Sequence, residues 1–230
     1  VPSLSDQAYG AILDDICDGT LPAGTHLVQE QLAAQLGVSR QPIQQALALL
    51  KADGMIEDVG KRGLRVTRLD LTAMRHHYDI RAALDGLAAR CAASNAEDGE
   101  FAKGIEQRGR GILAEGRKAD TAGKIGDMVR HDEAFHNLIY DASGNPLLSR
   151  TAEAHWRFLR RAMGEVLRHA EPPQDIWQQH EDILVAVLDA DTERAERLAI
   201  EHVEVAAETL STALDTSDGP GAGRSRQAEG

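Results

Sequence analysis

The chain has 230 residues, a net charge of −12 and only 3% aromatic residues. This length is enough for two modest domains, and a core with so few aromatic side chains has to be built from Leu, Ile, Val and Ala, as in helix bundles. No apolar stretch approaches the length needed to span a bilayer, and Cys17 and Cys91 form no CxxC pair or disulfide framework. The start of the chain has no basic-then-apolar signal pattern, so we expect a cytoplasmic protein without a membrane partner.

The first predicted elements are an amphipathic helix over residues 5–18 and, after a turn, a helix-turn-helix over residues 29–50. Gly37 follows the apolar face of the first helix of this pair, where a left-handed residue is needed, and Ser39 can cap the second helix. In the second helix the apolar residues recur at spacings of three and four, and they are expected to face the core: Ile43, Ala46, Leu47 and Leu50. The second helix of such a pair enters the major groove, so this part of the chain predicts a DNA-binding domain.

The polar side chains of the second helix are the ones expected to read bases. Arg40 can pair with a guanine or a phosphate, and Gln44 or Gln45 can hydrogen-bond the edge of an adenine. The alternative is an ordinary helical hairpin with a solvated polar face. It is disfavoured because the caps, the turn glycine and both apolar faces agree.

The segment after the helix pair predicts a wing. Residues 55–67 have the pattern of two short strands around a turn between Gly60 and Gly63, and the basic tip of this turn suits contact with the minor groove or with phosphates. Six basic and three acidic residues between Val38 and Arg68 give this region a net charge of +3, so the acidity lies elsewhere in the chain. The candidate DNA-binding residues of the helix pair and wing are Ser39, Arg40, Gln41, Gln44, Gln45, Lys61, Arg62, Gly63 and Arg65.

Beyond residue 72 the chain predicts helices and no strand. Residues 69–72 are expected to form a hinge, with Thr72 as the cap of the next helix. The expected helices cover residues 73–95, 101–118, 123–142, 147–170, 174–190 and 192–214. The fold is therefore predicted as mainly α, with a winged helix-turn-helix domain over 1–69, an all-helical bundle over 70–214 and a disordered tail over 215–230.

Four residues of the helical part have the character of metal ligands. Asp132 and His136 are four apart on one predicted helix and therefore share a face, whereas His180 and His202 belong to the last two helices. Facing helices of a bundle can bring three imidazoles and a carboxylate together, and such a set suits Zn²⁺, with Ni²⁺ or Mn²⁺ as alternatives. Spacing alone leaves open that these histidines are ordinary core residues, and the other six histidines are interpreted as structural or solvated.

These patterns carry a resemblance to a known family. The pattern from Leu21 to Val66, centred on Leu36-Gly37-Val38-Ser39-Arg40-Gln41-Pro42-Ile43, resembles the GntR family of bacterial transcription regulators. The later pattern, with Arg81, Leu84-Asp85, Asp132, Phe135-His136, Gly144-Asn145-Pro146-Leu147-Leu148, His180 and His202, resembles the FCD effector domain of its FadR subgroup. The resemblance covers roughly residues 5–210 and implies a homodimer on a pseudo-palindromic operator.

The resemblance also implies roles for individual residues. It implies that the metal is held by Asp132, His136, His180 and His202. It also implies that a small carboxylic acid binds at the open position of the metal, in a cavity that Arg81 faces. A guanidinium fits a carboxylate with two hydrogen bonds. The alternative for Arg81 is a surface pair with Asp85, four residues further on.

The chain departs from the family at two places. Gln44-Gln45 stand where the family usually has Arg-Glu, which removes one strong guanine or phosphate contact, and Asp85 stands where a Glu is usual. We expect a ligand-responsive regulator and not an enzyme, since no general base is placed beside the metal ligands. A direct sensor of the metal ion is the alternative, and a metal-dependent hydrolase or lyase is less favoured.

Overall fold

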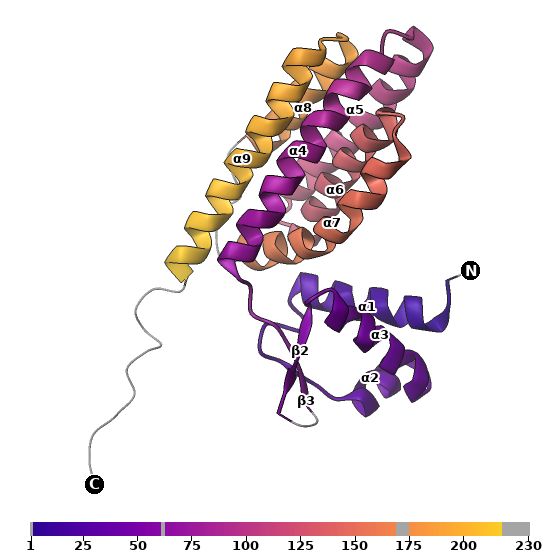
Figure 1. Ribbon diagram of the computed structural model, residues 1–230, viewed down its shortest axis with the longest axis vertical. Helices are drawn as coiled ribbons and strands as arrows, with labels where there is room; N and C mark the ends of the chain where they lie inside the picture. Colours follow the sequence, from indigo (N-terminus) through magenta and orange to yellow (C-terminus); the bar gives the residue numbers. More distant parts are fainter. Residues whose placement is uncertain (1, 61–62, 169–174, 218–230) are drawn as a thin grey trace.

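The computed structural model describes residues 2–60, 63–168 and 175–217, which form an N-terminal head and a helical bundle (Figure 1). The elements of the head are α1 (Leu4–Asp18), β1 (His26–Leu27), α2 (Gln29–Leu36), α3 (Arg40–Ala52), β2 (Ile56–Val59) and β3 (Gly63–Val66). The elements of the bundle are α4 (Leu71–Asn95), α5 (Gly99–Thr121), α6 (Ile125–Ala142), α7 (Pro146–Leu167), α8 (Ile176–Leu188) and α9 (Thr192–Ser217). The predicted mainly α fold, with a winged helix-turn-helix before an all-helical bundle, is confirmed.

The strands of the head form one antiparallel sheet in the order β1-β3-β2. The predicted wing consists of β2 and β3, in which Ile56 lies opposite Val66 and Val59 lies opposite Gly63. β1 was not predicted, because a strand of two residues is too short to show an alternating pattern. The buried face of α3 is the predicted one and consists of Ile43, Ala46, Leu47 and Leu50.

The turn between α2 and α3 has the predicted backbone but not the predicted capping bond. Gly37 closes α2 with φ at 65°, the left-handed conformation that glycine adopts without strain. Ser39 occupies the N-cap position of α3 with an extended backbone, but its side chain makes no capping hydrogen bond. The residue is exposed, so water can satisfy the first amides of α3 instead.

In the bundle, α4 and α9 lie side by side along most of their length (Figure 1). Small residues on α4 permit this close packing. A Cβ atom added at Gly86 would lie only 2.8 Å from Cγ1 of Ile200 on α9, and Ala89 and Ala93 of α4 are fully buried. The bundle and the head have separate hydrophobic cores, and Phe158 of α7 packs against both.

The helices of the bundle differ from the predicted ones at their ends. Asp70, not Thr72, caps α4, because Oδ1 of Asp70 accepts a hydrogen bond from the amide of Ala73 and Thr72 already lies inside the helix. Asp98 caps α5 in the same way, so that helix is longer than the predicted 101–118. The last helix, α9, continues through Ser217, so the expected tail from 215 begins within a helix; residues 218–230 lie outside the described part.

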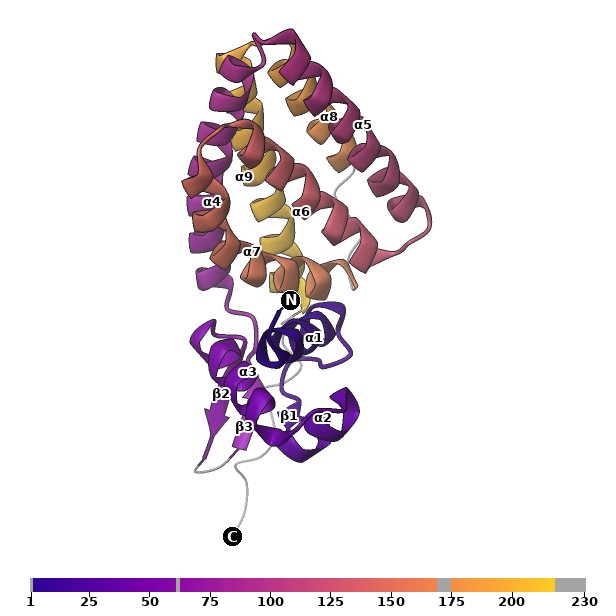
Figure 2. The same ribbon diagram turned by 90° about the vertical axis from the view of Figure 1, so that its right-hand side faces the viewer.

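The bundle contacts the head through α7, which faces α1 (Figure 2). The helices approach closely at Gly164, where a Cβ atom would lie 2.2 Å from the carbonyl oxygen of Cys17. Arg168 donates from Nη1 to the same carbonyl at 2.9 Å. Since the last turn of α1 has no basic residue of its own, Arg168 supplies a cation to its negative C-terminal end.

Other arginines of α7 also bind the head. Nη2 of Arg160 lies 2.7 Å from Oδ1 of Asp14 in α1. Arg161, only 2% exposed, donates to Oγ1 of Thr67 at 2.6 Å, directly after the last strand of the wing. One face of α7 therefore ties the DNA-binding elements to the bundle by charged hydrogen bonds, which are stronger than neutral ones.

Candidate metal centre

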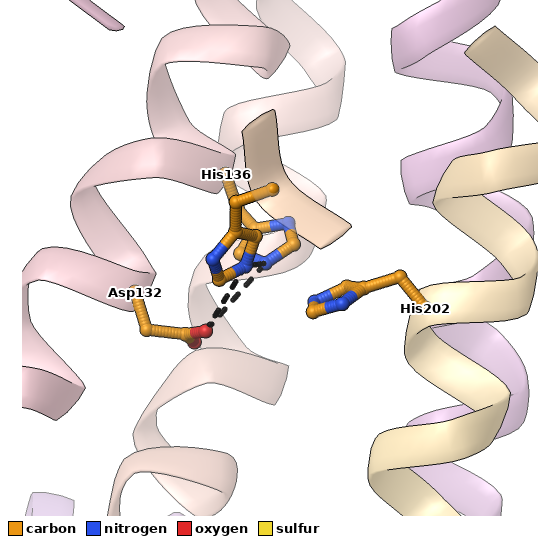
Figure 3. A group of neighbouring side chains, drawn as sticks. Asp132, His136 and His202 are labelled. Atoms are coloured by element: carbon orange, nitrogen blue, oxygen red, sulfur yellow. Dashed lines mark hydrogen bonds and ion pairs between the residues drawn. The ribbon is translucent and has the colours of Figure 1, made fainter. Parts of the chain in front are cut away.

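Four side chains converge in the middle of the bundle. Asp132 and His136 come from α6, and His202 reaches them from α9 (Figure 3). His180 comes from α8. One ligand atom of each residue lies within 4.8 Å of those of the other three. The three histidines are buried and the side chain of Asp132 is 13% exposed. The structure thus brings together the four residues that the sequence analysis singles out as metal ligands.

Two of the spacings between these atoms match a shell around one small cation, whereas Nε2 of His136 lies 3.9 Å from Oδ1 of Asp132. Nε2 of His180 lies 3.2 Å from Nε2 of His136 and 3.3 Å from Oδ1 of Asp132. In a tetrahedral site with bonds of about 2.0–2.1 Å the ligand atoms are roughly 3.3 Å apart. Oδ2 of Asp132 and Nδ1 of His180 are buried without a hydrogen-bond partner among the described residues. Three imidazole nitrogens and one carboxylate oxygen are a donor set that Zn²⁺ accepts.

A second layer of side chains orients two of the imidazoles. Nδ1 of His136 lies 3.0 Å from Oδ2 of Asp85, and Nδ1 of His202 lies 2.9 Å from Oε1 of Gln179. Each oxygen can accept the proton of Nδ1, which leaves the lone pair of Nε2 for the cluster. Tyr140 donates its hydroxyl to the other oxygen of Asp85 and so fixes that carboxylate.

The electrostatics at Asp132, His180 and His202 favour the protonation states that a metal requires. Burial raises the pKa of Asp132, but the hydrogen bond from His180 and the attraction of His136 and Arg81 outweigh it and hold that pKa well below its usual range. Burial lowers the pKa of His180, and burial together with the neighbouring His180 and His136 lowers the pKa of His202 well below its usual value. An ionised carboxylate and neutral imidazoles are the forms that bind a cation.

A cavity of about 50 Å³ lies directly beside the cluster. Asp132 and His202 line it, together with Tyr78 and Arg81 of α4. The rest of its wall is apolar and is formed by Met128, Val129, Met163, Leu167, Ile176, Trp177, Ala206 and Leu210. The cavity therefore gives a small ligand access to the edge of the candidate metal centre.

Arg81 lies between the cavity and the second layer. Its Nε is 3.2 Å from Oδ2 of Asp85, its Nη2 is 3.8 Å from Oδ2 of Asp132, and its guanidinium carbon is 4.3 Å from the ring centroid of Trp156. Burial lowers the pKa of Arg81, but the two carboxylates outweigh it and raise that pKa. The alternative of a surface pair with Asp85 is wrong, because both side chains are almost completely buried (2% and 3% exposed).

The candidate DNA-contacting residues lie on the exposed side of the head. Ser39, Arg40, Gln41, Gln44 and Gln45 are exposed at the start of α3. Arg40 lies 3.4 Å from Glu30, and Arg65 on β3 lies 2.7 Å from Glu57, so both guanidinium groups have carboxylate partners that a phosphate would have to replace. Gly63 begins β3, and Lys61 and Arg62 lie outside the described residues.

Known protein families match both parts of the chain. Residues 4–66 match the bacterial regulatory proteins of the gntR family, and residues 76–205 match the FCD domain. The chain belongs to the GntR family. It is a transcriptional regulator with an FCD domain, and the expectation that it is not an enzyme is confirmed.

Several relatives of this GntR regulator match it over almost their full length. The transcriptional repressor RspR of Escherichia coli is 27% identical over 90% of this chain and 89% of its own. A probable repressor of a D-xylose utilization operon from Paenarthrobacter nicotinovorans is 29% identical over 87% and 86%. The solved structure of Escherichia coli McbR/YncC superimposes with a TM-score of 0.76 at 20% identity, over 93% of this chain and 100% of that one, which shows a shared fold. Among the described residues of this regulator, each helix is too short or too polar to cross a bilayer.

Sequence reasoning misses the second layer of the site in this GntR regulator. Tyr140 is one helical turn after His136 and Gln179 directly precedes His180, so both are close to ligands in the sequence. Neither spacing shows which side chain hydrogen-bonds Asp85 or His202, because those partners come from other helices. The one available signal is the position of Tyr140 on the face of α6 that also carries Asp132 and His136.

Proposed function

We propose that this GntR regulator binds a pseudo-palindromic operator as a homodimer, and that a small carboxylic acid bound beside a divalent metal ion changes its affinity for that operator. The observation that carries the proposal is the convergence of Asp132, His136, His180 and His202 beside the cavity lined by Arg81. As an operator-binding protein it would act in the cytoplasm. The exposed Ile80 of α4 and Val205 of α9, on adjacent helices, support a dimer through the bundle.

The residues of the site have separable roles. Asp132 and the three histidines would hold the ion, with Zn²⁺ preferred and Ni²⁺ or Mn²⁺ as alternatives, and the ion would supply a positive charge that attracts a carboxylate. Arg81 is positioned to donate to that carboxylate, because its Nη2 is buried without a hydrogen-bond partner among the described residues. Trp156 restricts the guanidinium from one side. A bound acid would thus contact α4 directly and α7 through the cavity wall.

The path from this site to DNA runs through α7. In α7, Trp156 lies against the Arg81 guanidinium and Met163 lines the cavity. Arg160 and Arg161 of the same helix bind the head. A shift of α7 would therefore change the position of α3, whose exposed polar residues are proposed to enter the major groove. A coupling free energy of about 1–3 kcal/mol is sufficient to change operator occupancy several-fold.

The test begins with a binding site selected from random duplex DNA by the full chain, and fluorescence anisotropy then measures the affinity. We expect a palindromic site, two chains per site, and a several-fold change in affinity when an acid is added to the Zn²⁺-loaded protein. His202→Ala should abolish this change, whereas His131→Ala, beside Asp132 on the same helix, should retain it. An affinity that no acid in a broad panel alters would refute the proposal.

Direct sensing of the metal ion is the second candidate. It is favoured by the number of protein ligands, because one oxygen and three nitrogens already fill a tetrahedral shell. Removal of the ion by a chelator and its restoration, with no acid present, separates the two functions. A metal sensor loses and regains operator control in this experiment, whereas an acid sensor requires the acid as well.

A further inference from the structure

From the cavity beside the candidate metal centre, we propose that the effector is a short monocarboxylate with an apolar body, rather than a dicarboxylate or a sugar acid. The inference rests on the acid-sensing function proposed above and specifies its ligand. It depends on where polar and apolar groups lie along the cavity, on the number of positive charges in its wall, and on its size.

The wall changes from polar to apolar along the helices. On α9, His202 is followed one and two turns later by Ala206 and Leu210, and on α6 Met128 precedes Asp132 by one turn; all of these residues line the cavity. The apolar part of the wall therefore lies toward the C-terminal end of α9 and the N-terminal end of α6. The C-terminal end of α9 lies at the end of the bundle nearest the head (Figure 1). The polar end of a ligand thus fits the metal cluster, and the rest of it meets an apolar wall.

The polar end has unused hydrogen-bond donors. Nη2 of Arg81 and the hydroxyl of Tyr78 are buried and have no hydrogen-bond partner among the described residues, although both residues line the cavity. Each residue is only 2% exposed, and buried donors are costly to leave unpaired. A carboxylate can accept from both groups, and this pairing would satisfy them.

Positive charge lies at the polar end of the cavity only, where Arg81 lines the wall and the proposed ion would be held. Arg81 is the one cationic side chain in its wall, as far as the described residues show. A second carboxylate would have to lie against Met128, Met163 or Leu210 with no cation beside it, and burial of an unpaired charge is strongly unfavourable. The hydroxyls of a sugar acid would lose their water in the same place, where the indole N–H of Trp177 is the one buried donor without a partner that the described apolar side chains offer them.

The size of the cavity favours a short chain. Its volume of about 50 Å³ corresponds to roughly four water-sized spheres. Four such spheres match a carboxylate with one further carbon, so a carboxylate with three or four further carbons requires the flexible side chains of Met128 and Met163 to move aside. Butanoate and isovalerate are therefore suitable probes.

The test compares acids of matched length on the Zn²⁺-loaded full chain. Butanoate and succinate have the same four-carbon chain and differ in the second carboxylate; isovalerate and gluconate extend the comparison to a branched and a polyhydroxylated acid. Binding is followed by calorimetry and by fluorescence of the two tryptophans, of which Trp177 lines the cavity and Trp156 stacks on Arg81. We expect butanoate and isovalerate to bind at least tenfold more tightly than succinate and gluconate. Equal or tighter binding of succinate or gluconate overturns the inference but not acid sensing, whereas failure of all four acids to bind argues against both.

A variant of the apolar wall gives an independent readout. Met128→Lys places a second cation in the cavity wall and should shift the preference toward succinate by tenfold or more. If the lysine variant does not fold, Met128→Gln is a milder change of similar shape. It should reduce the ratio of the affinity for butanoate to the affinity for succinate. Leu147→Gln on α7, where the leucine is 62% exposed, is the control that should leave the preference unchanged. An unchanged preference in a folded Met128→Lys protein also contradicts the inference.

Discussion

Trp156 and Arg81 connect the two halves of the proposed mechanism, because the guanidinium of Arg81 lies 4.3 Å from the ring centroid of Trp156. Arg81 belongs to α4 and pairs with Asp85 and Asp132, whereas Trp156 belongs to α7, the helix that contacts the head. Cation–π contacts of this kind are stronger when they are shielded from water, as here. A ligand that moves Arg81 would therefore act directly on α7, the helix that holds the DNA-binding elements.

Replacement of Arg81 should be severely destabilising. Arg81→Met leaves the buried carboxylate of Asp85 without its cation, and removal of one partner of a buried ion pair costs about 3–5 kcal/mol. Arg90→Met is the matched control on the same helix; Arg90 pairs with Glu196 but is half exposed, so its loss should cost at most about 1 kcal/mol. Urea unfolding followed by circular dichroism measures both free energies. Similar costs for the two variants would contradict the buried role of Arg81.

Metal binding should raise the thermal stability of the protein. A ligand present at 100 times its dissociation constant stabilises the folded state by about 2.7 kcal/mol. We expect Zn²⁺ to raise Tm of the wild-type chain and of His131→Ala, and to leave Tm of His202→Ala nearly unchanged. Differential scanning fluorimetry with Zn²⁺ or with a chelator provides the comparison. A wild-type Tm that does not respond to chelation or to added Zn²⁺ would count against the metal centre.

The close contact between α7 and α1 makes a specific prediction for Gly164. In Gly164→Ala the new Cβ would meet the carbonyl oxygen of Cys17, a backbone atom that moves only with α1. We expect a loss of about 1–3 kcal/mol, as for other overpacked contacts, and faster amide exchange in α1. Gly111→Ala in α5, where a Cβ meets nothing within 4 Å, should instead gain about 0.5–1 kcal/mol from helix propensity. If amide exchange in α1 is the same in Gly164→Ala as in wild type, the contact between Gly164 and Cys17 does not stabilise α1.

Local signals predicted most of the fold, whereas the ligands of the candidate site were predicted only with the family resemblance, and long-range pairing could not be predicted. The turn at Gly37 depends on backbone conformation and the buried face of α3 on apolar spacing, both of which are visible in the sequence. The spacing of Arg81 and Asp85 shows that they can pair, but their burial depends on helices far away in the chain. The contact of Arg168 with the carbonyl of Cys17 joins residues 151 positions apart and has no local pattern.

A pair of histidines outside the metal cluster should make stability depend on pH. Nδ1 of His77 lies 2.9 Å from Nδ1 of His155, and the ring of His77 stacks on Phe158, which packs against both cores. Burial lowers the pKa of both imidazoles, and the neighbouring His155 and His76 lower that of His77 further. In the unfolded chain both groups have the ordinary pKa of about 6.5. The unfolded state therefore binds more protons at mildly acid pH, and the stabilisation that is complete above pH 6.5 is lost as the pH falls through and below that value.

This dependence can be assigned to the pair with two glutamine variants. The free energy of unfolding of wild type should fall between pH 7.5 and 5.5, and His155→Gln should reduce this fall because one of the two coupled imidazoles is removed. His76→Gln changes an exposed neighbour on α4 and should retain most of the fall. His180 and His202 of the metal cluster also have lowered pKa values, but they are present in all three proteins. A difference in how steeply the free energy of unfolding falls with pH therefore reports the His77–His155 contact. A slope in His155→Gln as steep as that of wild type would mean that protonation of this pair does not oppose folding.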